Sequence, residues 1–187
     1  MDIEQLLAVR TAYRIHPIEV AEGGVVVCGV MLAGVSLTKH LAGCSECAVM
    51  AVTLGMDVDR MMRRLQVIDM GQAVRLDGDA NRYIEDICDS LQREITVDAH
   101  ERGLYVTTRF SPGYGDLALG YQRDLLRLSG ADKTTGITAT SSNLLVPQKS
   151  VTAIIGLGAC RPAKANLCDE CSISDRCTKI RCQYEKI

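Results

Sequence analysis

Residues 104–116 read LYVTTRFSPGYGD and combine a β-strand with a rigid polar turn. Leu104–Thr108 is rich in residues that favour strands. Pro112 restricts its own φ and Gly113 accepts a positive φ, so the turn that follows has a defined shape. Arg109, at the end of the strand, can hold a carboxylate through two parallel hydrogen bonds. The segment therefore predicts a strand that ends in a ligand-binding turn.

The hydrophobic pattern on either side of this segment predicts the longer elements. Cys47–Leu54 is a short apolar run and Ser150–Leu157 is rich in β-branched residues, so both are expected to be strands. Two amphipathic helices are expected before residue 104, because apolar residues recur there at helical spacing. The first carries Val58, Met61, Met62, Leu65 and Ile68; the second spans 79–97, carries Ile84, Ile87, Cys88, Leu91 and Ile95, and ends at Gly103.

Single residues set the expected boundaries of the other elements. Asp57 is expected to cap one helix and Asp116 another, over 117–129. Pro17 is expected to interrupt regular structure. The remaining assignments are helices at 2–11 and 29–41, an irregular stretch at 13–22, a turn with a cap at 77–79, and a strand at 137–140.

Strands and helices are interleaved, but no strand–turn–helix unit carries a nucleotide-binding fingerprint. This arrangement predicts an α+β fold, with a twisted antiparallel or mixed sheet flanked by helices. The fold is expected to occupy residues 1–160. Residues 161–187 have a different, cysteine-rich composition and are expected to form a small metal-binding tail.

Composition narrows the functional classes. The 187 residues are 47% hydrophobic and carry a net charge of −2 with intermixed signs, so no basic field for nucleic acid is expected. The amino-terminal residues lack the positive region of a signal peptide, and no apolar run is long enough to span a membrane. Nine cysteines without a secretory signal indicate a reducing, cytoplasmic location.

Two motifs resemble the activation domain of cobalamin-dependent methionine synthase. The first is Arg109, three residues, then Gly113 and Tyr114. The second is the segment 140–147, TSSNLLVP, followed by Ser150-Val151 at the start of a strand. The resemblance covers roughly residues 45 to 158. The family fold, a twisted antiparallel sheet flanked by helices, agrees with the fold expected from the pattern.

The resemblance implies that the chain binds S-adenosylmethionine and supports reductive methylation of cobalamin. No Asp-x-His-x-x-Gly segment occurs, so the cobalamin is expected on a partner: a methionine synthase or another corrinoid protein. The electron is expected from a redox protein such as ferredoxin or flavodoxin. Cobalt performs the covalent step, so this chain would supply positioning, and calling it an enzyme is partly a convention. The cofactor-binding residues carried over are Arg109, Ser111, Gly113, Tyr114, Glu85 and Ser141.

The tail places four thiols within fifteen residues: Cys168, Cys171, Cys177 and Cys182. Four thiolates can surround a 4Fe–4S cluster or a tetrahedral zinc ion. Three interpretations stay open: an iron–sulfur cluster, which is favoured, zinc, and free or redox-active thiols. Cys44 and Cys47 form another closely spaced pair, expected to be core thiols rather than a disulfide.

Plainer interpretations remain open for the site residues and for the function. Arg109 could be a surface ion-pair partner, Tyr114 a turn residue, and Glu85 a solvated carboxylate. Ser141 could be an ordinary turn hydroxyl. The alternative function is a non-catalytic iron–sulfur or zinc protein that carries electrons to, or chaperones, a corrinoid protein. A methyltransferase acting on a small molecule is a weaker third candidate.

Overall fold

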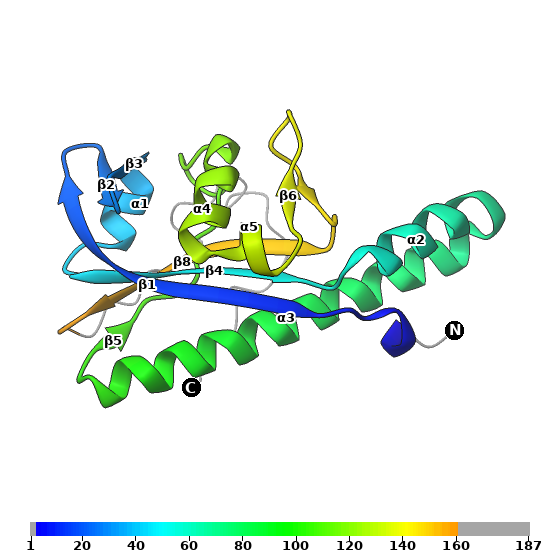
Figure 1. Cartoon of the computed structure of the whole chain (residues 1–187), viewed down its shortest axis with the longest axis horizontal. Coiled ribbons are helices and arrows are strands. Elements are labelled where there is room, and N and C mark those ends of the chain that lie inside the picture. Colours follow the sequence, from blue (N-terminus) through cyan, green and yellow to red (C-terminus); the bar gives the residue numbers. More distant parts are fainter. Residues whose placement is uncertain (1–2, 161–187) are drawn as a thin grey trace, which may run out of the picture.

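The structure, a computed structural model, describes residues 3–160 and has an α+β fold in which one antiparallel sheet lies between two layers of helices (Figure 1). The strands follow the order β3-β2-β1-β4-β8-β5. Their bounds are β1 Arg10–Ala21, β2 Gly24–Val27, β3 Val30–Ala33, β4 Glu46–Thr53, β5 Tyr105–Val106 and β8 Ser150–Gly158. A separate hairpin pairs β6, Thr138–Ala139, with β7, Leu145–Val146. The predicted α+β fold with helices flanking the sheet is confirmed.

The two apolar runs form the centre of the sheet. β4 pairs along its whole length with β1 on one side and β8 on the other. Its residues from Cys47 to Thr53 are all buried, because helices cover both faces of the sheet. A strand covered on both faces has no solvent side, which explains why the sequence shows an unbroken apolar run instead of alternation.

Two helices cover one face of the sheet, α2 (Met56–Ile68) and α3 (Met70–Glu101). The short 3-10 helix Ile3–Leu6 lies against them, in place of the helix expected over 2–11. The buried stripe of α3 recurs every three or four residues and packs on β4 and β8. It consists of Ala73, Leu76, Ala80, Ile84, Cys88, Leu91, Ile95 and Ala99.

Helix α3 is longer than predicted, and the turn expected at residues 77–79 is wrong. Gly78 lies inside the helix, with no atom within 4 Å of the position a Cβ would take. A glycine in a helix costs about 1 kcal/mol relative to alanine. Ala73, Leu76 and Ala80 bury their side chains on either side of it, and this burial offsets that cost.

The opposite face of the sheet carries α1 (Val35–His40), α4 (Gln122–Ser129) and α5 (Ala131–Thr134). A 3-10 turn, Leu119–Tyr121, leads into α4 within the helix expected over 117–129. Leu37 and Leu41 pack with Leu125 against Val49 and Ile154 of the sheet. The two faces therefore have separate cores on either side of the same three central strands.

The expected interruption at Pro17 is wrong, because β1 runs straight through it. Pro17 is the last residue of β1 that pairs with β4, and pairing with β2 begins at Ile18. The N–H of Ile18 donates to Ser45 O on the β4 side. Successive N–H groups of a strand point to opposite sides, so an N–H at residue 17 would point to the β2 side, where the pairing of β1 with β2 has not yet begun. Proline therefore removes no ladder hydrogen bond here.

The helix expected over 29–41 is also partly wrong. Its first half is strand β3, joined to β2 by a two-residue turn at Cys28-Gly29, and only Val35–His40 is helical. Both turn residues have positive φ, +48° and +77°, as a tight hairpin of this kind requires. The apolar run was ambiguous because a buried strand pair and a buried helix have the same composition.

Two expected helix caps also differ from the structure. Gly55 precedes α2, and Asp57 lies inside its first turn. Asp116 does not cap the segment that follows it. Its carboxylate instead accepts hydrogen bonds from the N–H groups of Val35, at 2.6 Å, and Ser36, at 3.0 Å, at the start of α1.

The predicted metal ligands Cys168, Cys171, Cys177 and Cys182 lie outside the described residues, as does the whole segment 161–187. Between residues 3 and 160, no helix combines the length and the apolar character needed to cross a membrane.

Candidate functional site

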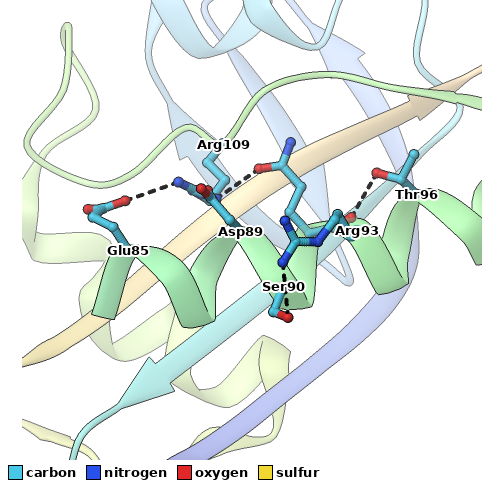
Figure 2. Close-up of polar contacts among 7 residues, drawn as sticks. Glu85, Asp89, Ser90, Arg93, Thr96 and Arg109 are labelled. Atoms are coloured by element: carbon cyan, nitrogen blue, oxygen red, sulfur yellow. Dashed lines mark hydrogen bonds and ion pairs between the residues drawn. The ribbon is translucent and has the colours of Figure 1, made fainter. Parts of the chain in front are cut away.

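Arg109 lies on an extended segment that follows β5 along the edge of β8. The N–H groups of Thr107 and Phe110 donate to Gly156 and Ile154 of β8. Phe110 is buried in the core beside α1 and α4. Arg109 reaches the opposite side and lies over α3 (Figure 2). Successive side chains of an extended segment point to opposite sides, so the neighbours Arg109 and Phe110 lie on opposite faces of the sheet.

Three side chains of α3 hold the Arg109 guanidinium. Nη1 donates to Asp89 Oδ1 at 2.7 Å and to Gln92 Oε1 at 3.0 Å. Nη2 donates to Glu85 Oε2 at 3.1 Å. Figure 2 shows the Arg109 side chain over α3, with Glu85 and Asp89 on successive turns of the helix. Arg109 and Glu85, both expected site residues, are therefore brought together.

The burial of the three charged groups differs. The side chain of Arg109 is 20% exposed, whereas those of Glu85 and Asp89 are 63% and 57% exposed. Partial burial lowers the pKa of Arg109, but the hydrogen bond to Asp89 and the neighbouring negative charges outweigh it and raise that pKa above its ordinary value. The arginine is thus a fixed cation, while its acidic partners face solvent.

The turn after Arg109 is stabilised by its own backbone. The N–H of Gly113 donates to Leu117 O and that of Tyr114 to Ser111 O. Gly113 has a φ of +96°, as expected from its place after Pro112. These two N–H groups are consequently engaged within the turn, whereas Tyr114 as a whole is 68% exposed and accessible to a partner. Ser111 is half-buried in the same turn.

The turn is anchored to the start of α1. Gly115 approaches Ser36 so closely that a Cβ would lie 2.8 Å from the Ser36 side chain. Asp116 binds the first two N–H groups of the same helix. These contacts fix the position of the turn between the strand that carries Arg109 and the layer of α1 and α4.

Ser141 lies apart from this cluster, in the turn of the β6–β7 hairpin. Arg123 of α4 donates to the carbonyl of Thr140 and holds that hairpin. Among residues 3–160, no hydrogen bond or ion pair links Ser141 to Arg109. The structure therefore brings Arg109 and Glu85 together, whereas Ser111, Gly113 and Tyr114 lie in the turn that follows Arg109 and is anchored to α1, and Ser141 lies in a separate hairpin.

Sequence reasoning did not identify Asp89 and Gln92. The signal was present, because residues 85, 89 and 92 recur at spacings of four and three and so lie on one face of a helix. They flank the apolar stripe at Cys88, whose thiol is buried and has its pKa raised to about 12 by that burial.

A hollow of about 530 Å³ lies elsewhere, between α4, α5 and β6. It contains none of the expected site residues. Its lining comprises Gly120, Arg123, Asp124, Leu126, Arg127, Asp132, Ile137, Thr138 and Ala139. In the described part of the chain, no group of three or more His, Cys, Asp or Glu side chains could hold a metal ion.

The chain was compared with known families, curated proteins and solved structures. No family model and no curated protein matches it. Solved structures do match, among them the crystal structure of the MetH reactivation domain bound to AdoHcy, with a TM-score of 0.64 and 17% sequence identity. The alignment covers 92% of this chain and 66% of that one.

The comparison identifies the fold. The chain has the fold of the MetH reactivation domain, as the two motifs of the sequence predicted. At 17% identity the likeness concerns architecture, and the chain spans about two thirds of that neighbour's length.

Proposed function

We propose that this chain binds S-adenosylmethionine and supports the reductive methylation of cobalamin held by a separate protein. One observation carries the proposal. Arg109 and Glu85, assigned to the site from sequence, form an ion pair at 3.1 Å on the fold of a domain that has AdoHcy bound. AdoHcy is what remains when S-adenosylmethionine has donated its methyl group, so a site for one suits the other.

The residues present suit the amino-acid end of this ligand. Arg109 is a half-buried cation that can take the ligand carboxylate. Glu85 is the more exposed of the two acidic partners of Arg109 and makes the longer contact. The ligand carboxylate would therefore replace Glu85 at the guanidinium. Because the Glu85 side chain is 63% exposed, water screens its contact with Arg109 and can solvate the released carboxylate, so this exchange costs little. Asp89 and Gln92 would keep the guanidinium in place, and Glu85 would then be available to the ligand ammonium.

Tyr114 and Ser111 complete the proposed site from the turn. The exposed phenol can pack on the ligand and donate a hydrogen bond. S-adenosylmethionine supplies the methyl group, and cobalt(I) of the partner is the nucleophile. This chain then contributes orientation and stabilises the docked arrangement of the partner. The partner is a corrinoid protein or a cobalamin-dependent methionine synthase, with ferredoxin or flavodoxin as electron donor.

Thermal unfolding with S-adenosylmethionine or AdoHcy tests the proposal. A ligand present at one hundred times its Kd stabilises by about 2.7 kcal/mol. For a domain of this size that corresponds to a rise in Tm of about 5–10 °C. We expect this rise for the full chain and a rise below about 1 °C for Arg109→Ala, which lacks the group that holds the ligand carboxylate.

Arg82→Ala is the matched control, because Arg82 forms an exposed ion pair with Asp79 on the same helix. It should keep the full ligand-induced rise. An undiminished rise in Arg109→Ala would contradict the site. No rise with either ligand in the wild-type chain would contradict S-adenosylmethionine binding and favour a metal-dependent electron carrier or chaperone for a corrinoid protein.

A further inference from the structure

Cys28 occupies an exposed turn on the side of the sheet that carries α1 and α4. The pairing of Val27 with Val30 leaves only Cys28 and Gly29 to connect β2 and β3. Cys28 has a φ of +48°, which is uncommon for a residue with a side chain. Its thiol is a free, exposed group. The hairpin thus presents a sulfur atom at the surface.

The thiol contacts an imidazole. Cys28 Sγ lies 3.1 Å from Nδ1 of His16 on the neighbouring strand β1. The other ring nitrogen, Nε2, lies 2.8 Å from the carbonyl oxygen of Leu128. A carbonyl only accepts hydrogen bonds, so Nε2 carries the hydrogen, and Nδ1 of the neutral ring has a lone pair directed at the thiol.

The Leu128 carbonyl also holds the His16 ring in position. Leu128 lies in the last turn of α4, where carbonyl groups lack partners within the helix. The carboxyl end of a helix carries partial negative charge and stabilises a nearby cation. When Nδ1 takes the thiol proton, the resulting imidazolium keeps its hydrogen bond to this helix end. A nucleophile, its base and a group that orients the base are therefore present together.

The other thiols of the described chain differ from Cys28. Cys47, which pairs directly with His16, is buried, and burial raises its pKa to about 12. Cys88 is buried as well, and partial burial raises the pKa of Cys44. Cys160 is exposed. Within residues 3–160, only Cys28 combines exposure with a hydrogen bond to an imidazole. Twelve residues separate it from His16, so no sequence motif marks the pair.

We propose that Cys28 is a reactive thiol that exchanges with low-molecular-weight disulfides, with His16 as its proton acceptor. The Cys28 S–H proton passes to Nδ1 of His16, and the sulfur attacks one sulfur of the small disulfide. The S–S bond of the small disulfide breaks as a mixed disulfide forms on Cys28. The departing thiolate takes the proton from His16. The step therefore converts one thiol and one disulfide into a new thiol and a new disulfide, with no net oxidation.

The test uses the full chain and oxidised glutathione as the probe. Peptide mass spectrometry measures the initial rate of mixed-disulfide formation at Cys28 and at Cys160 in the same molecules. An unassisted thiol is only a few per cent thiolate near neutral pH, so assistance by His16 should raise the rate about tenfold or more. We expect Cys28 to react about ten times faster than Cys160, and His16→Gln to remove this advantage without changing the rate at Cys160.

Two further measurements separate the chemistry from a loss of structure. In urea-unfolded wild-type chain, the two cysteines should react at similar rates, because the His16 contact is gone. Nitrogen NMR of the folded protein should find the hydrogen of neutral His16 on Nε2, with an Nδ1 signal that shifts in Cys28→Ser. Equal native rates at Cys28 and Cys160, or an unchanged Cys28 rate in folded His16→Gln, would overturn the proposal.

Discussion

Asp116 illustrates how one carboxylate connects distant parts of the chain. It follows the Arg109 turn in sequence, yet it binds the N–H groups that begin α1, about eighty residues earlier. The first N–H groups of a helix have no partner within the helix, and a carboxylate there also suits the helix dipole. Asp116 therefore both holds the turn in position and accepts hydrogen bonds from the first N–H groups of α1.

The carboxylate of Asp116 should make stability depend on pH. Desolvation raises its pKa, but the hydrogen bonds from Ser36 and Val35 outweigh this and bring the pKa below its ordinary value. A group with a lowered folded pKa stabilises above its unfolded pKa, about 3.9, and that contribution is lost as pH falls through the folded value. Asp116→Ala should lower the urea midpoint near pH 7 and by less near pH 3.

Urea unfolding of the wild-type chain and the variant at both pH values measures this. Asp57→Ala is the control, since Asp57 is an exposed residue in the first turn of α2 that pairs only with Arg60 among the described contacts. A gap between Asp116→Ala and wild type that is equally wide at both pH values would contradict the account.

At the scale of elements, two glycines lie in opposite surroundings. Gly78 of α3 has open space where a Cβ would be. Gly156 of β8 does not, since a Cβ there would lie 2.6 Å from Cys44 Sγ and 2.7 Å from Leu41 Cδ2. Glycine in β8 allows the loop after α1 to pack directly on the sheet, whereas glycine in α3 only weakens the helix.

Substitution by alanine should therefore have opposite effects at the two positions. Gly78→Ala should stabilise the protein by about 0.5–1 kcal/mol through helix propensity. Gly156→Ala should destabilise it by about 1–3 kcal/mol through overpacking against Cys44 and Leu41. Chemical denaturation of both variants measures this, and a destabilising Gly78→Ala or a neutral Gly156→Ala would contradict the packing described.

At the scale of the whole molecule, the sheet lies between two groups of residues for which we propose separate functions. The Arg109–Glu85 pair of the proposed cofactor site lies where the Arg109 segment meets α3, and the Cys28–His16 pair lies on the opposite face with α1 and α4. Each face has its own core, and the central strands contribute to both. A substitution that affects one site through a surface side chain should leave the other unchanged.

The cysteine-rich tail is expected to act as a third, independent unit. After anaerobic reconstitution, we expect iron and sulfide in the full chain, and loss of both in a Cys168→Ala and Cys171→Ala double variant, because four thiolates are needed for the cluster. The rise in Tm with S-adenosylmethionine should persist in that variant. Metal analysis and EPR provide the readout; stoichiometric zinc without iron would contradict the cluster.

Several features of the molecule could be predicted from local sequence alone. The buried strand at β4, the apolar stripes of α2 and α3, and the turn after Arg109 were predicted because periodicity and residue type act over a few neighbours. The resemblance of Arg109, Gly113 and Tyr114 to a known family also indicated the fold before any strand order was known. These features could be predicted because the residues that determine them lie close together in the sequence.

Only the tertiary structure determined which distant residues meet. Asp89 and Gln92 hold Arg109, Asp116 caps α1, and His16 contacts Cys28 because the strand order places their segments side by side. Pro17 fits in β1 for the same reason, since the neighbouring ladder begins one residue later. Strand order and helix orientation arise from packing two cores on one sheet, and that free energy is shared by residues far apart in the chain.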